Sequence, residues 1–318
     1  MEVAAAVQEV DQASLKGVTL SSPQLKKFQL IHALVLLLLP AVGTAAAIVL
    51  YFIHGVSPVT ITVFLIFYLL TMLGGSVGYH RLFAHRAFKC GRGVKVLLAI
   101  LGSMTAQGSP IYWVSNHRRH HEYSDRNGDP HSPYAVERPG LLDKLKGLWF
   151  AQVTWTFQHE LTNSTRYAKD LLRDRDICRV SARYFHWVTL SLMLPAIISG
   201  LYTWSLYGAL EGFLWGGLVR IFLSYHATSS INSLSHMIGS RRYETRDRST
   251  NIGWMSIITV GESFHNNHHA FPASARFAHD WKDIDIGYYV IKLLEGCRLA
   301  WDVRTPPKKI PTGGCDEK

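Results

Sequence analysis

Long uncharged stretches alternate with polar segments along this chain. The first apolar stretch covers 30–52 and the second covers 59–78, with the short segment 54–58 between them. Two more follow at about 186–207 and 208–230, and Arg220 and His226 interrupt the last one. Each stretch can cross a bilayer as a helix, which takes about 20 residues. The pattern predicts an all-α integral membrane protein with four transmembrane helices in two hairpins.

The remaining segments are predicted to form tails and a cap. Segments 79–185 and 231–304 join the four helices in one membrane domain, 29–304, and are expected to fold as a helical cap. The polar N-terminal tail, 1–28, and the C-terminal tail, 305–318, are expected to be poorly ordered. The cap is therefore the part of the chain in which a polar site can be built.

Basic residues gather in the polar segments rather than at the hairpin tips. Lys and Arg total 33 against 23 acidic residues, a formal charge of +10. Seventeen of them lie within 79–185 and twelve after 230, whereas the loops at 54–58 and about 203–208 have none. Because cytoplasmic loops are enriched in Lys and Arg, the termini and both polar segments are predicted to face the cytoplasm. Membrane attachment explains this charge without nucleic acid, and an acidic protein partner fits it better.

Histidines are concentrated in the predicted cap. The chain has sixteen, and nine of them form four tight groups in the two polar segments. These nine are His80, His85, His117, His120, His121, His236, His265, His268 and His269. Two groups have the spacing i, i+3, i+4, which on a helix is expected to aim three imidazoles at a common point. The end of the second apolar stretch fixes the first group at the membrane surface.

The number of histidines indicates two metal ions. Imidazole suits iron, zinc, copper and nickel, and nine ligands exceed what one ion takes. Zinc without redox chemistry normally has four ligands, so two redox-active irons with four or five imidazoles each explain the count better. Soluble diiron proteins use carboxylates from two Glu-x-x-His motifs, and only Glu262 to His265 has that spacing here. A histidine-ligated diiron centre is therefore predicted.

The sequence around these histidines resembles that of integral-membrane fatty acyl desaturases of the stearoyl/delta-9 type. The stretches that carry the resemblance are "GYHRLFAHRAF" (78–88), "WVSNHRRHHEYSD" (113–125), "GDPHSP" (128–133), "NSLSH" (232–236), "GESFHNNHHAFPASAR" (261–276) and "LAWDV" (299–303). The resemblance implies a helical cap over four transmembrane helices and a dimetal centre at their junction. It implies that the nine histidines are the metal ligands and that Asn232 contacts a metal through water.

The same resemblance implies an O2-dependent reaction that introduces a double bond into an acyl chain. The chain would be carried on a lipid, an acyl carrier protein or CoA, and electrons would come from a ferredoxin or cytochrome b5 type donor. Ser115 and Asn116 stand where animal acyl-CoA enzymes have Arg-Asp, and they are candidates for carrier recognition. In this respect the chain is similar to bacterial, cyanobacterial and plant members, which favours a lipid or a carrier protein.

Further residues are candidates for supporting roles. Asp125, Asp129 and Glu262 lie close to the histidine groups in sequence and are expected to orient ligand imidazoles. Tyr68 and Met72 share one face of the second span, at the end of the substrate tunnel that the resemblance implies, where bulk indicates a short or terminally processed chain. Trp113 is expected to line the chain path, although a plain packing role is equally open. His131 is expected to be structural.

Other activities remain open at this level. An acetylenase, a terminal desaturase or a hydroxylase would use the same centre, and nothing in the histidine groups separates these outcomes. A histidine-rich membrane metal transporter predicts histidines in the middle of the spans, since polar groups there mark a pathway. Apart from His226, near Arg220, the histidines avoid that zone. A histidine-rich scaffold predicts no bound metal.

Overall fold

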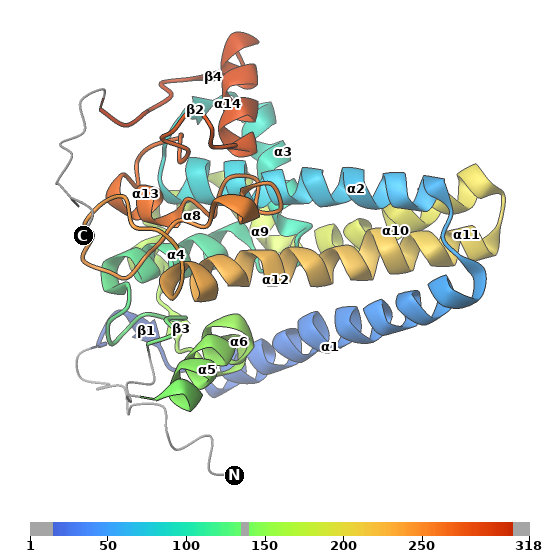
Figure 1. The fold of residues 1–318 in the computed structure, drawn as a ribbon, viewed down its shortest axis with the longest axis horizontal. Helices are drawn as coiled ribbons and strands as arrows, with labels where there is room; N and C mark the ends of the chain where they lie inside the picture. Colours follow the sequence, from blue (N-terminus) through green and yellow to red (C-terminus); the bar gives the residue numbers. More distant parts are fainter. Residues whose placement is uncertain (1–14, 135–139, 308–318) are drawn as a thin grey trace.

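Four long helices run side by side through the protein (Figure 1). The computed structural model describes residues 15–134 and 140–307. The first two are α1 (Pro23–His54) and α2 (Pro58–Leu73), which continues as the π-helical η2 (Gly74–Ala84). The third is α10 (Tyr184–Thr203), and the fourth comprises α11 (Leu206–Glu211), η4 (Gly212–Val219), α12 (Arg220–Ser233) and η5 (Leu234–His236). All four are long and apolar enough to cross a membrane.

Serine caps explain where these helices begin. The side chains of Ser22, Ser57 and Ser205 each accept a hydrogen bond from a backbone N–H in the first turn that follows. The predicted division of the third and fourth spans at 207/208 needs correction. Trp204 is in the left-handed conformation and ends α10, so the fourth helix begins at Leu206. The second and fourth helices also extend beyond their apolar stretches, to Ala84 and His236.

The fourth helix lies at the centre of the membrane part. α1 packs against η4 and α12, while α2 packs against η4 and α10. Small residues permit such close packing, since a Cβ atom on Gly43 of α1 would lie 2.3 Å from Leu218 Cδ1 of η4, and one on Gly216 of η4 would lie 2.4 Å from Pro195 Cβ of α10. Thus α1 and α2 are consecutive in sequence, but each makes its main contacts with the fourth helix.

Shorter elements gather at the end where η2 and α12 finish (Figure 1). The helices are α3 (Arg92–Ser103), α4 (Pro110–Tyr123), α5 (Leu141–Trp149), η3 (Phe150–Thr154), α6 (Trp155–Gln158), α7 (Ser164–Tyr167), α8 (Lys169–Leu172), α9 (Arg175–Ala182), η6 (Gly253–Ser256), α13 (His265–Ala270) and α14 (Ile286–Gly296). Two antiparallel strand pairs join β1 (Thr19–Leu20) to β3 (Leu161–Thr162) and β2 (Lys89–Cys90) to β4 (Ala300–Trp301). These pairs fasten both ends of the described chain to the cap.

Part of the predicted N-terminal tail is ordered, which corrects that expectation. Leu15 and Val18 are buried against Tyr167, and β1 pairs with β3. Two apolar side chains and the antiparallel pairing of β1 with β3 therefore anchor 15–20 to the cap. Residues 1–14 lie outside the described part of the chain, as do 308–318 of the C-terminal tail.

Close packing of η2 on α3 fixes the position of the first histidine group. A Cβ atom at Gly74 would lie 2.3 Å from the backbone nitrogen of Gly102, and one at Gly78 would lie 2.9 Å from Leu98 O. The hydroxyl of Tyr79 shares a 2.9 Å hydrogen bond with that of Ser103. These contacts lock η2 immediately before His80.

Candidate metal centre

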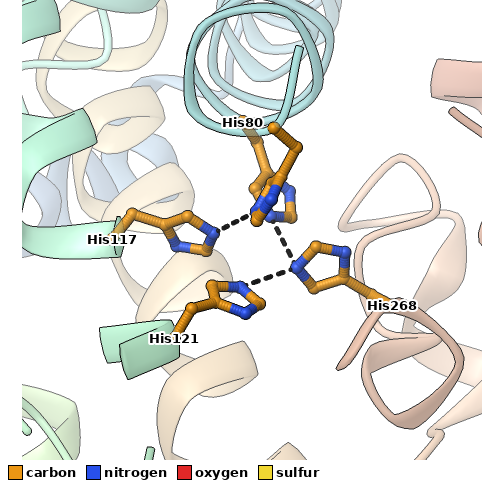
Figure 2. A group of neighbouring side chains, drawn as sticks. His80, His117, His121 and His268 are labelled. Atoms are coloured by element: carbon orange, nitrogen blue, oxygen red, sulfur yellow. Dashed lines mark hydrogen bonds between the residues drawn. The ribbon is translucent and has the colours of Figure 1, made fainter. Parts of the chain in front are cut away.

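The nine histidines converge in two groups. In each group, one ring nitrogen from every histidine lies within 4.8 Å of the others. The first group comprises His80, His85, His117, His121 and His268, and the second comprises His120, His236, His265 and His269. Figure 2 shows four members of the first group, from η2, α4 and α13, with their rings pointing toward one another. Together, four segments that are far apart in sequence therefore build the two groups.

The helices α4 and α13, which carry the i, i+3, i+4 histidines, each contribute ligands to both groups. This corrects the expectation that the three imidazoles of each helix point to one common site. His117 and His121 of α4 belong to the first group, while His120 belongs to the second. In α13, His265 and His269 are in the second group and His268 is in the first. At about 100° per residue, i and i+4 project within about 40° of each other, whereas i+3 diverges from i+4 by about 100°. The helices therefore lie between two sites.

Carboxylates hold the outer nitrogens of four histidines. The Nδ1 atoms of His120, His236 and His269 donate to Asp129 at 2.9 Å, Asp125 at 2.8 Å and Asp247 at 2.7 Å, respectively. His80 Nδ1 donates to Glu262 in the same way. A neutral imidazole that donates through Nδ1 carries its lone pair on Nε2. These carboxylates therefore fix the tautomer that suits metal binding.

The Nε2 atoms face one another inside both groups. His85 Nε2 lies 2.7 Å from His117 Nε2, and His268 Nε2 lies 2.9 Å from His121 Nε2. In the second group, His265 Nε2 lies 3.0 Å from both His236 Nε2 and His269 Nε2. Where a carboxylate holds the proton on Nδ1, as at His236 and His269, such contacts bring ring lone pairs toward the centre of the group. The donor set therefore fits a cation at the centre of each group.

Burial favours the neutral form of six of these imidazoles. It lowers the pKa of His85, His117, His121, His265 and His268 well below the usual range, and neighbouring imidazoles lower it further. His269 has its pKa lowered to about 4 by burial, although Asp247 opposes this. Burial would raise the pKa of Asp129, but the charge and hydrogen bond of His120 lower it overall. Neutral imidazoles braced by ionised carboxylates are what a metal cation requires.

The second group also contains an unused ring nitrogen. His120 Nε2 is buried and has no hydrogen-bond partner among the described residues. Buried polar atoms are normally paired, so this one is explained by a ligand that the group receives. Burial would lower the pKa of His120, but the charge and hydrogen bond of Asp129 raise it overall.

A buried arginine anchors the carboxylate beside His80. Arg81 is fully buried, and its guanidinium lies 3.1 Å from Glu262 Oε1 and 2.8 Å from Asp285 Oδ1. The hydroxyl of Ser76 also donates to Glu262. The guanidinium carbon of Arg81 also lies over the ring of Phe277, 4.1 Å from the ring centroid. Glu262 is thus held by Arg81 and Ser76 while it orients His80.

Two cavities border the histidine groups. The inner cavity is lined by residues that include Met72, His80, Ile231 and His265. The polar cavity is lined by residues that include Tyr112, Asn116, His131 and Trp155. Both are lined in addition by Gln107, Trp113, His117, Thr228 and Asn232. A molecule that occupies both would pass directly beside the metal groups.

The family of the chain follows from its match to known proteins. The family model described as "Fatty acid desaturase" matches residues 57–280. The chain belongs to the fatty acid desaturase family. The resemblance read from the histidine motifs is therefore confirmed, and the protein is a membrane-bound oxidoreductase. This favours an enzyme over the transporter and scaffold alternatives.

Three relatives illustrate the range of the family. The desaturase is 44% identical over 296 residues to hex-5-enoyl-[acyl-carrier protein] acetylenase of Moorena producens (strain JHB), covering 93% of this chain and 92% of the relative. It is 35% identical over 274 residues to Delta-9 acyl-lipid desaturase 1 of Arabidopsis thaliana, covering 84% of both. It is 34% identical over 247 residues to sn-1 stearoyl-lipid 9-desaturase of Anabaena variabilis, covering 77% and 84%.

The other residues predicted from the sequence differ in whether they contact the clustered histidines or line the cavities. Asp125, Asp129 and Glu262 each accept a hydrogen bond from a clustered histidine, as described above. Met72, Trp113 and Asn232 line the cavities. Tyr68 is not among the lining residues and donates instead to Ile258 O at 2.9 Å. The hydroxyl of Ser115 donates hydrogen bonds to Ile111 O and Ser164 Oγ, whereas its neighbour Asn116 lines the polar cavity.

Asp247 was missed by reasoning from the sequence. It lies in the loop after η5, eleven residues beyond His236, at no spacing typical of a metal site. Its carboxylate is organised by backbone and hydroxyl donors, including Ser249 N at 2.9 Å and Thr245 Oγ1 at 2.9 Å. The sequence shows only an acidic residue in a polar loop of the cap, and many surface carboxylates occur in such loops.

Proposed function

We propose that the two histidine groups of this desaturase each hold one iron ion. Five imidazoles in the first group and four in the second satisfy what iron accepts from nitrogen ligands. Asn232 lines both cavities beside His117, which suits a contact to a metal through water. The observation that carries the proposal is the convergence of the nine Nε2-bearing rings, with carboxylates on four of the outer nitrogens.

Iron and O2 would supply the oxidising power that removes two hydrogens from adjacent carbons of an acyl chain. An aliphatic C–H bond has no useful acidity, so the side chains alone cannot break it by general acid–base catalysis. The protein would position the chain through the cavities that border His80, His117 and His265. Electrons would come from a separate donor of the ferredoxin or cytochrome b5 type.

The proposed orientation places the centre and both termini on the cytoplasmic side. The cap carries most of the basic residues, and the short connections at His54–Pro58 and Trp204–Ser205 carry none. Under the positive-inside bias, the cap faces the cytoplasm and these connections lie across the membrane. The two consecutive helix pairs would then act as hairpins that deliver His80 and His236 to one side.

A second candidate outcome is triple-bond formation or terminal desaturation on a short acyl chain bound to a carrier protein. Met72 lines the inner cavity, is only 4% exposed and packs with Ala227 and Val260, so its bulk supports a short acyl chain there. The relative from Moorena producens is an acetylenase whose name specifies a hex-5-enoyl chain on acyl carrier protein. Hydroxylation of the same carbon atoms would begin from the same centre.

Product analysis tests this function. The purified full chain, loaded with iron and given a reductant and O2, is supplied with acyl chains of several lengths on lipid, CoA and acyl carrier protein. Mass spectrometry should show loss of two hydrogens, or of four in all from a saturated chain if a triple bond forms. His117→Ala should abolish the product. Full product formation by His117→Ala with unchanged metal content would contradict the proposal.

A further inference from the structure

An exposed loop of the cap gathers arginines that form no ion pair with a carboxylate of the described residues. The loop comprises residues 238–248 and follows η5, at the end of the fourth helix opposite α11 (Figure 1). Its exposed charged residues are Arg241, Arg242, Glu244, Arg246 and Arg248. Elsewhere on the cap, arginines such as Arg86 and Arg92 pair with aspartates. The loop therefore presents a net positive charge to its surroundings.

The same loop is hydrogen-bonded to the supports of the second histidine group. Asp247, within the loop, accepts a hydrogen bond from His269 Nδ1 at 2.7 Å. The backbone N–H of Arg248 donates to Asp125 Oδ2 at 2.7 Å, and this oxygen also accepts from His236 Nδ1 at 2.8 Å. Two of the four histidines in the second group are therefore separated from the loop by a single carboxylate.

A buried asparagine fastens the loop to α13. The backbone N–H groups of Arg242 and Tyr243 both donate to Asn266 Oδ1 at 2.8 Å, and Asn266 Nδ2 donates to Tyr243 O at 2.9 Å. Asn266 is completely buried and follows directly after His265, a member of the second group. The loop therefore presents its arginines from a backbone that is fixed relative to the metal centre.

The proposed reaction needs electrons from outside the protein. O2 takes up four electrons when it becomes two waters, and removal of two hydrogens from the acyl chain supplies two of them. The other two must come from a donor, which is oxidised by one electron in each of two encounters if it is a one-electron carrier. Electron transfer slows steeply with distance, and hydrogen bonds couple it better than gaps do. Asp247 and Asp125 provide such a connection from the loop to the second group.

We infer that the loop 238–248 is the docking surface of a small, soluble, acidic electron carrier of the ferredoxin type. This rests on the proposed function, because it assigns the entry point of the electrons that the reaction needs. Exposed arginines attract an acidic surface and fix its orientation on contact. Ile238, at the start of the loop, is 56% exposed and adds an apolar contact. Electron-transfer interfaces are typically small and weak, which lets the carrier leave after each transfer.

The composition and place of the loop favour a soluble carrier over an anionic membrane surface. Apart from Ile238, every exposed residue of the loop is glycine, serine, arginine or glutamate. Segments that lie on a membrane combine basic residues with several large apolar ones, which this loop lacks. The loop also lies at the end of the molecule opposite α11, beyond the end of α12 (Figure 1). A carrier that diffuses in solution can reach it there.

A second set of exposed basic residues lacks the connection to the metal centre. Lys169, Arg173 and Arg175 are exposed at α8 and the start of α9. Their acidic neighbours, Asp170 and Asp174, accept hydrogen bonds from arginine and lysine side chains, and within the described chain neither accepts one from a histidine. This set therefore offers a control with the same charge and no link to either histidine group.

Equilibrium binding tests the docking surface without turnover. The full chain, in nanodiscs of zwitterionic lipid with its iron kept oxidised, is titrated with a fluorescently labelled acidic [2Fe–2S] ferredoxin. At ~0.1 M salt, charges more than about 10 Å apart are largely screened. Arg242→Gln combined with Arg246→Gln and Arg248→Gln should weaken binding about 10-fold, as expected for the loss of three exposed charge pairs. Arg241 is kept, because its guanidinium donates to Asp247 O at 2.9 Å within the loop.

The second basic set supplies the matched control. Lys169→Gln combined with Arg173→Gln and Arg175→Gln removes the same charge and should change the dissociation constant by less than about 2-fold, since screening limits its reach. Iron content and thermal unfolding establish that both triple variants fold. Absence of ferredoxin binding by the wild-type chain, or equal binding by the two triple variants, would overturn the inference.

Reduction kinetics and competing partners complete the test. Anaerobic mixing of the oxidised full chain with reduced ferredoxin should reduce the iron about 10-fold more slowly in the loop variant, and added salt should slow the wild-type chain. If anionic vesicles or a cytochrome b5 haem domain bound more tightly than ferredoxin through the same arginines, the assignment to a ferredoxin-type carrier would be wrong. Product formation by the wild-type chain with a small reductant tests the proposed function separately, so turnover without ferredoxin binding would refute the docking surface alone.

Discussion

At the scale of single residues, carboxylates decide how the histidines present their ring nitrogens. Three of the four carboxylates stand close to a histidine motif and could be predicted from the sequence, because second partners of ligand histidines are commonly acidic. Asp247 could not be predicted, since only the folding of the loop after η5 brings it to His269. Residue types that suit a metal are therefore visible in the sequence, whereas their partners depend on loop conformation.

Asp247→Asn should weaken metal binding in the second group. The substitution keeps the size of the side chain but removes the charge that opposes the lowered pKa of His269. Loss of such a partner typically costs about 10- to 100-fold in metal affinity. Titration with a competing chelator measures this. Asp302→Asn, at an exposed pair with Lys89, is the control and should leave metal affinity unchanged.

At the scale of elements, helical spacing explains why two groups form rather than one. The i, i+3, i+4 pattern was visible in the sequence and correctly places 117–121 and 265–269 on helices. Its division between two sites follows from the angle between i+3 and i+4, which matters only once α4 and α13 face each other. The extension of α2 into η2 could not be predicted either, since polar residues begin at Tyr79.

Gly74→Ala should destabilise the protein and disturb the first group. The added methyl group would lie 2.3 Å from backbone atoms of α3, which cannot rotate away, so η2 and α3 must separate. Overpacking of this kind costs about 1–3 kcal/mol. Thermal unfolding in detergent and metal content measure the two effects. Gly93→Ala, on the exposed side of α3 with no atom within 4 Å, should be neutral or stabilising.

At the scale of the whole molecule, apolar length was sufficient to find four spans. Their packing was not predictable, because every apolar face can contact several neighbours and the central place of the fourth helix depends on small residues such as Gly216. Membrane orientation rests on the distribution of charge, which concerns the entire chain rather than any one element.

Labelling with a membrane-impermeant maleimide tests the orientation. Cys297 is exposed in the cap, and Trp204→Cys adds an exposed thiol between the third and fourth helices, in a background with Cys90, Cys178 and Cys315 changed to Ser. Cys297 should react only from the cytoplasmic side of sealed vesicles, and the introduced thiol only from the other side. Reaction of both thiols from the same side would contradict the four-span topology.

The central claim is that nine histidines hold two irons in two separable groups. Iron content per chain, measured on protein purified anaerobically after full loading, tests it most directly. The wild-type chain should hold two irons. His85→Ala, in the first group, and His236→Ala, in the second, should each lower the content toward one iron. A single iron in the wild-type chain, or two irons retained in both variants, would contradict the account.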